Sequence, residues 1–85
     1  MIRSDAEVMS GLLAVVKQDP TAALAAFTAA QKLVPANARA YLYEAQVHAQ
    51  AGDLPATIAA LRRGLAAAPG AQELSAALVQ LGQVP

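Results

Sequence analysis

Two prolines, Pro35 and Pro69, lie 34 residues apart, and each follows a segment of the same design. Before each proline, a small residue, a large apolar residue and a second small residue occupy positions i, i+4 and i+7. These residues are Ala23, Phe27 and Ala30 before Pro35, and Thr57, Leu61 and Gly64 before Pro69. That spacing places the three residues on one face of an α-helix. A period of 34 residues is the length of a helix–turn–helix unit, so the spacing predicts two such units in tandem.

Residues that typically begin or end helices divide the 85-residue chain into five expected helices, at about residues 4–17, 20–34, 38–51, 54–68 and 72–81. Ser4 followed by Glu7 has the pattern of a capping box, and Gly52 is expected to end a helix in the left-handed conformation. Three other polar residues are expected to cap the helices that follow them: Asp19, Asn37 and Asp53. Connections this short make consecutive helices antiparallel neighbours, so an all-α fold is predicted.

Composition excludes several classes of function. Six acidic and six basic residues leave no net charge, which argues against binding of nucleic acid through its phosphates. No cysteine is present, which removes thiol catalysis and cysteine-ligated metal. No apolar run is long enough to insert into a membrane, and the first residues lack the pattern of a signal peptide, so a cytoplasmic location is expected.

The two units resemble tetratricopeptide repeats. Ala23, Phe27, Ala30 and Pro35 occupy the four places that define the second helix of such a repeat, and the second unit follows the same register. In the first helices, small residues are usual where this chain has Gly11 and Ala45, and an aromatic is usual where it has Tyr41. Glu44 stands where that family usually has leucine.

The resemblance implies a tetratricopeptide-like α-solenoid, a right-handed superhelix of antiparallel helix pairs in one domain, 1–85. Its parts would be repeat one at 4–37, repeat two at 38–71 and a closing helix at 72–82. The alanine-rich composition resembles that of bacterial members. Such repeats are interaction scaffolds, so the resemblance implies a non-enzymatic protein that binds a protein or peptide partner.

In that family the first helices of successive units line a concave groove. The resemblance therefore implies partner-binding residues at Val8, Met9, Leu12, Val15, Val16, Arg39, Leu42, Tyr43, Gln46 and Gln50. The same face also includes Asp5, Ala49, Glu73, Ala76, Ala77 and Gln80. Its first half is unusually apolar, which favours a hydrophobic peptide or helix as the partner. Arg39, Gln46 and Gln50 would fix the partner's register by hydrogen bonds.

Two other interpretations of the apolar face remain open. The face could be covered by Met1 and Ile2 or by a further repeat. It could instead pair with a second copy, groove to groove or through the terminal helices, because both ends of the stack are incompletely polar and the last helix carries Leu74 and Val79. The second interpretation predicts a homodimer or larger homo-oligomer as the function itself.

Several specific sites are argued against. Family members that bind chaperone C-terminal carboxylates use cations in the groove, but the matching positions here are Val8, Leu12, Tyr43, Glu73 and Ala77. Binding of such tails is therefore not expected. His48 alone cannot build a metal site and is expected to pack, and Arg62 and Arg63 are expected to form a solvated face. No cofactor site and no catalytic constellation are predicted.

Overall fold

A computed structural model describes residues 3–83 and contains five helices in that range. They are α1 (Arg3–Val16), α2 (Pro20–Leu33), α3 (Ala38–Gln50), α4 (Leu54–Ala67) and α5 (Gln72–Gln80). Residues 3–83 contain no strand. The helices expected from the sequence are all present, and each begins and ends within one residue of its expected position. None of these helices combines the length and hydrophobicity needed to cross a bilayer.

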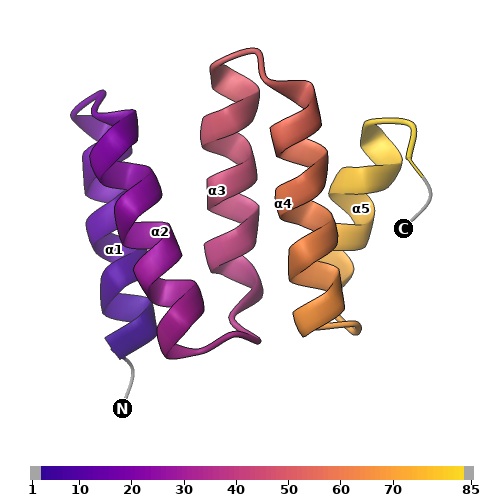
Figure 1. Ribbon diagram of the computed structural model, residues 1–85, viewed down its shortest axis with the longest axis horizontal. Coiled ribbons are helices and arrows are strands. Elements are labelled where there is room, and N and C mark those ends of the chain that lie inside the picture. The colour runs from indigo at the N-terminus through magenta and orange to yellow at the C-terminus, as the bar shows by residue number, and fades with distance from the viewer. Residues whose placement is uncertain (1–2, 84–85) are drawn as a thin grey trace.

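The helices form a thin slab with principal extents of 30 × 29 × 14 Å. Figure 1 shows the antiparallel pairs α1–α2 and α3–α4, with α5 beside α4 at the C-terminal end. In this view α2 lies in front of α1, and α4 lies in front of α5. The all-α solenoid architecture predicted from the sequence is confirmed.

Two hydrophobic clusters hold the slab together, one for each repeat of the sequence pattern. The first contains Phe27 with Ala23 and Ala30, all fully buried between α1, α2 and α3. The second is built around Leu61, which packs with Leu74 and Leu78 of α5. Truncation of a large core side chain such as Phe27 or Leu61 typically costs about 2–5 kcal/mol. The 34-residue pattern therefore marks the residues on which folding depends.

Close helix contact requires glycine at two places in these clusters. A Cβ atom added to Gly11 would lie 2.7 Å from Cδ1 of Phe27, and one added to Gly64 would lie 2.7 Å from Cβ of Tyr41. Real Cβ atoms do not approach other carbons this closely. The small residues at these positions thus set the separation of α1 from α2 and of α3 from α4.

Helix caps differ in part from the sequence expectation. Asp19 and Asp53 cap α2 and α4 as predicted, each accepting a hydrogen bond of 3.1 Å from a backbone N–H in the first turn. Gly52 has the expected left-handed backbone, with φ +77°. Asn37 makes no side-chain cap bond at the start of α3.

Ser4 and Asn37 instead join the first helix to the turn between α2 and α3. The buried Ser4 hydroxyl donates to the carbonyl of Ala30 at 2.8 Å, and Nδ2 of Asn37 donates to Ser4 Oγ at 2.9 Å and to Asp5 Oδ1 at 3.2 Å. The prediction of a capping box at Ser4 was wrong, because this hydroxyl lies inside α1 and satisfies a distant carbonyl. Local spacing cannot reveal a bond that spans 26 residues.

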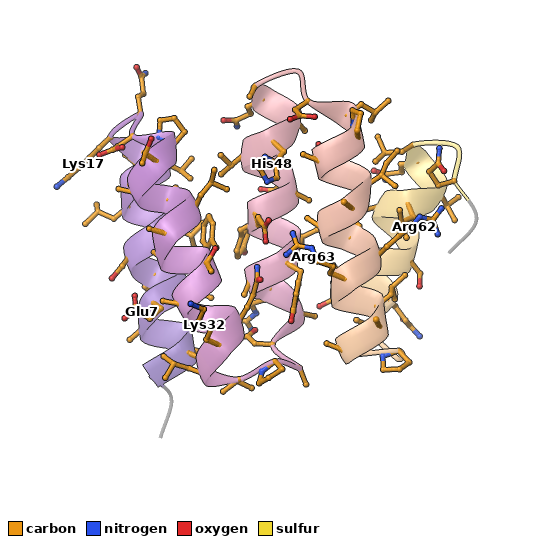
Figure 2. The ribbon with its side chains drawn as sticks, in the orientation of Figure 1. Glu7, Lys17, Lys32, His48, Arg62 and Arg63 are labelled. Carbon is orange, nitrogen blue, oxygen red and sulfur yellow. The ribbon has the colours of Figure 1, made fainter. Side chains whose placement is uncertain are left out.

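Glu44, which stands where the family usually has leucine, is 7% exposed and lies between α2 and α4. Its carboxylate accepts hydrogen bonds from Nε2 of Gln31 at 2.5 Å and from a guanidinium nitrogen of Arg63 at 2.6 Å. His48 Nε2 lies 3.4 Å from the same carboxylate. Figure 2 shows His48 and Arg63 on the side of the slab that faces the viewer. The expectation that Arg63 only forms a solvated face was therefore incomplete.

These partners control the ionisation of Glu44. Burial by itself raises the pKa of its carboxyl group. Hydrogen bonds from Gln31 and Arg63, the positive charge of Arg63 and the contact with His48 together outweigh burial, and the pKa lies below its ordinary value. A carboxylate whose pKa is lowered on folding stabilises the fold above its unfolded-state pKa. That stabilisation is lost as pH falls through the lowered folded-state value.

Gly64→Ala tests the close approach of α3 and α4. We expect it to destabilise the fold by about 1–3 kcal/mol through overpacking against Tyr41 and Leu74, even though alanine has the better helix propensity. Thermal unfolding followed by circular dichroism measures this change. Gly70→Ala is the control, since a Cβ there meets nothing within 4 Å. Equal effects of the two substitutions would contradict the packing argument.

Glu44→Gln tests the carboxylate network. We expect it to lower the free energy of unfolding at pH 7 by about 1.5–2 kcal/mol, at the lower end of the range for hydrogen bonds to charged groups. It should also flatten the fall in stability between pH 5 and the acid limit, because a glutamine does not titrate. Urea unfolding across this pH range measures both effects. Glu73→Gln is the control, since Glu73 is exposed and takes no part in this network, and it should lower the free energy of unfolding at pH 7 by less than Glu44→Gln does.

Candidate protein-interaction surface

Three hollows lie on the face formed by α1, α3 and α5, opposite the Glu44 network. The turn hollow, of about 240 Å³, is lined by Val15, Gln18, Asp19, Pro20, Val47, Gln50 and Ala51. The central hollow, of about 30 Å³, is lined by Leu12, Val15, Tyr43, Gln46, Val47 and Gln50. The α5 hollow, of about 400 Å³, is lined by Leu42, Ala45, Gln46, Ala49, Thr57, Leu61, Glu73, Ala76, Ala77, Gln80 and Leu81.

The three hollows adjoin one another. The turn hollow and the central hollow share Val15, Val47 and Gln50, and the central hollow shares Gln46 with the α5 hollow. They therefore form one depression across α1, α3 and α5, which we call the groove. Its length follows from the parallel arrangement of the first helices of successive pairs, visible in Figure 1.

The α5 hollow is the largest part of the groove. Its lining includes buried residues, Ala45, Thr57 and Leu61, contributed by α3 and α4. Its exposed lining residues include Gln46 and Gln80, whose side-chain amides can both donate and accept hydrogen bonds. An apolar hollow with a few polar groups at its edge is the usual form of a binding site.

Most of the residues expected in the groove lie there. Six of the partner-binding residues predicted from the sequence line the hollows: Leu12, Val15, Leu42, Tyr43, Gln46 and Gln50. The Tyr43 ring also packs against Phe27, with ring centroids 5.8 Å apart, so the first core cluster holds it in position. Five of the additional residues mapped to this face line the α5 hollow: Ala49, Glu73, Ala76, Ala77 and Gln80.

Other expected residues lie elsewhere. Val8 is 3% exposed and packs in the first core cluster, so it offers almost no surface to a partner, contrary to its expected role. Met9 and Val16 are 67% and 77% exposed but line none of the three hollows, and the exposed Arg39 does not line them either. The suggestion that Met1 and Ile2 cover the apolar face concerns positions outside residues 3–83.

Several lining residues were not anticipated. Thr57 and Leu61 belong to α4 and were assigned to the core, yet both also reach the α5 hollow. Val47 and the α1–α2 turn were likewise not placed in the groove. The 34-residue register did not indicate Val47, since the equivalent Leu13 of the first unit was not expected in the groove and lines none of the hollows. It could not indicate the turn, whose contribution depends on how α3 packs beside it.

Between positions 3 and 83, no three or more histidine, cysteine, aspartate or glutamate side chains come together in a way that could hold a metal ion. His48 contacts Glu44 on the other side of the slab and lines none of the hollows. The chemistry of the groove is therefore that of an apolar surface edged by amides and two carboxylates.

Comparison with known proteins agrees with the helical repeats. A family model described as tetratricopeptide repeat matches residues 8–72, which extend from α1 to the first residue of α5. No curated protein and no solved structure gives a significant match. Repeats of this family generally mediate protein–protein interactions and generally serve as non-enzymatic scaffolds. Because the match covers more than half of the sequence and follows the observed helix pairs, the chain belongs to the tetratricopeptide repeat family.

Proposed function

We propose that this protein binds a segment of a partner protein in the groove, with an apolar side chain of the partner in the α5 hollow. The continuity of the three hollows carries this proposal, because it provides one surface that crosses both repeats. The α5 hollow, at about 400 Å³, is within the size range of ligand pockets.

Burial of apolar surface supplies the affinity in this mechanism. Each large apolar side chain that the partner buries is worth about 1.5–3 kcal/mol. Gln46, Gln50 and Gln80 are exposed along the groove, and their amides hydrogen-bond the partner's backbone and fix its register. The rigid packing of α3 beneath them lowers the entropy lost on binding, since Tyr43 and Ala45 are held by the core clusters.

Ala76→Arg tests binding in the groove. Ala76 is exposed and lines the α5 hollow, so an arginine there should obstruct the hollow without disturbing the core. We expect peptides selected against the wild type from a random dodecapeptide display library to bind this variant at least about tenfold more weakly, equivalent to about 1.4 kcal/mol. Fluorescence polarisation with the selected peptides measures the affinities.

Ala59→Arg is the matched control, because Ala59 is exposed on α4 and lines none of the hollows. Circular dichroism establishes that both variants remain folded. Selected peptides that bind the Ala76→Arg variant as tightly as the wild type would refute the assignment of the groove.

A second candidate function is self-assembly through α1. Met9, Leu13 and Val16 are 67%, 55% and 77% exposed, and their i, i+4, i+7 spacing places them on one side of the helix. The residues equivalent to Met9 and Leu13 in the second repeat, Tyr43 and Val47, pack against the first core cluster. The open edge of α1 lacks that cover within the described chain, and a second copy paired along this edge would supply it.

Light scattering across a concentration series tests self-assembly. If α1 edges pair, the wild type should have the mass of a dimer or larger species at micromolar concentration, and Leu13→Glu should shift it to a monomer by placing a charge in the contact. Val79→Glu provides the control, since Val79 is 58% exposed on α5 at the other end of the stack. A wild-type monomer throughout the series would exclude this function.

A further inference from the structure

The charges that line the groove all have one sign. Asp19 lines the turn hollow and Glu73 lines the α5 hollow, and no lysine, arginine or histidine lines any of the three hollows. The remaining polar side chains of the lining are uncharged: Gln18, Gln46, Gln50, Gln80, Thr57 and Tyr43. A groove in an electrically neutral protein is thus negative along its own surface.

The two carboxylates lie at opposite ends of the groove. Asp19 belongs to the turn between α1 and α2, and Glu73 lies in the first turn of α5. Figure 1 shows this turn and the start of α5 at opposite corners of the slab, one at the upper left and the other at the lower right. A segment that follows the groove therefore meets a carboxylate near each of its ends and apolar surface between them.

Neither carboxylate forms an ion pair within the described chain. The ion pairs among residues 3–83 involve Glu44, with Arg63 and His48, and not Asp19 or Glu73. Lys17 precedes the turn, but Figure 2 shows its side chain directed away from α3, and it lines none of the hollows. Arg39 is exposed at the start of α3 and also lies outside the lining.

From this arrangement we infer that the groove selects a partner segment with apolar residues at its centre and lysine or arginine toward its ends. This inference rests on the proposed function. Carboxylates at the edge of an apolar depression attract cationic side chains, and they repel acidic ones that would lose water on entry. The groove therefore discriminates against acidic segments, because repulsion by its two carboxylates contributes to specificity.

Both carboxylates also have local roles, and these do not require a partner. Asp19 caps α2 through Oδ1, which accepts from the N–H of Ala22, and Glu73 lies at a helix start where negative charge is favourable. Capping needs an oxygen acceptor and not a charge, because asparagine caps about as well as aspartate. Asp19→Asn therefore removes the charge and keeps the helix cap.

The experiment compares peptides selected from a random dodecapeptide display library against the wild type and against the double variant Asp19→Asn/Glu73→Gln. We expect lysine and arginine to be enriched over aspartate and glutamate among wild-type binders, and this enrichment to disappear for the double variant. Basic binders should lose about two- to tenfold in affinity for the double variant at low salt, as expected for two exposed ion pairs. The difference should shrink as salt is raised.

Asp53→Asn is the matched control. Asp53 caps α4 with the same 3.1 Å bond geometry as Asp19 but lines none of the hollows, so this variant should select the same basic peptides as the wild type. Loss of the enrichment of basic residues in this control would show that removal of a capping charge changes peptide selection by altering the stability of the fold. That result would overturn the inference.

The remaining outcomes separate the inference from the proposed function. Failure to select any peptide that the Ala76→Arg substitution weakens would overturn the proposed function itself. Selection of groove-binding peptides without a basic bias, or with an acidic one, would leave that function standing and overturn the charge selection. Basic peptides that bind wild type and double variant equally would also overturn it.

Discussion

The structure depends on how closely the two helices of each pair approach one another. Phe27 of α2 reaches α1 at Gly11, and Tyr41 and Leu74 meet α4 at Gly64, at distances that no Cβ atom would permit. These contacts fix the helix separation inside each pair, and the large residues then fill the space between successive pairs. The hollows of the groove lie on the other contacts, between the first helices of successive pairs: α1 and α3 line the central hollow, and α3 and α5 line most of the α5 hollow.

The side of the slab near α2 and α4 tolerates a buried carboxylate because Glu44 has hydrogen-bond partners on both helices. Glu44 takes the place of a leucine that would normally fill the junction between two repeats, and it reaches Gln31 of α2 and Arg63 of α4. A leucine would contribute non-directional hydrophobic contacts, whereas the carboxylate links three helices through hydrogen bonds of defined geometry. The loss of stability expected for Glu44→Gln does not mean that the network is more stable than an apolar junction, because replacement of a buried ion pair by apolar residues is often neutral or stabilising.

Periodicity predicted the helices, their pairing and the core residues of α2 and α4, because each of these depends on spacing along one helix. The bonds from Ser4 to Ala30 and from Asn37 to Ser4 were not predictable in this way, since they join residues 26 and 33 positions apart. Val8 also shows the limit of prediction from periodicity. Its register placed it on the groove face, but the packing of α1 against α2 and α3 turns it into the core. Residues near the boundary between two helix faces are assigned by packing, which periodicity does not determine.

The negative charge of the groove likewise depends on long-range packing, which local sequence patterns do not predict. Asp19 and Glu73 each have a sufficient local explanation as residues at a helix start, and the sequence gives no reason to consider them together. Only the packing of α1, α3 and α5 into one face makes them the two charges of a single surface. No basic side chain lines the three hollows, since Arg63 is held by Glu44 and Lys17 points away from α3. A neutral chain can therefore present a negative groove, because the fold distributes its positive charges over other surfaces.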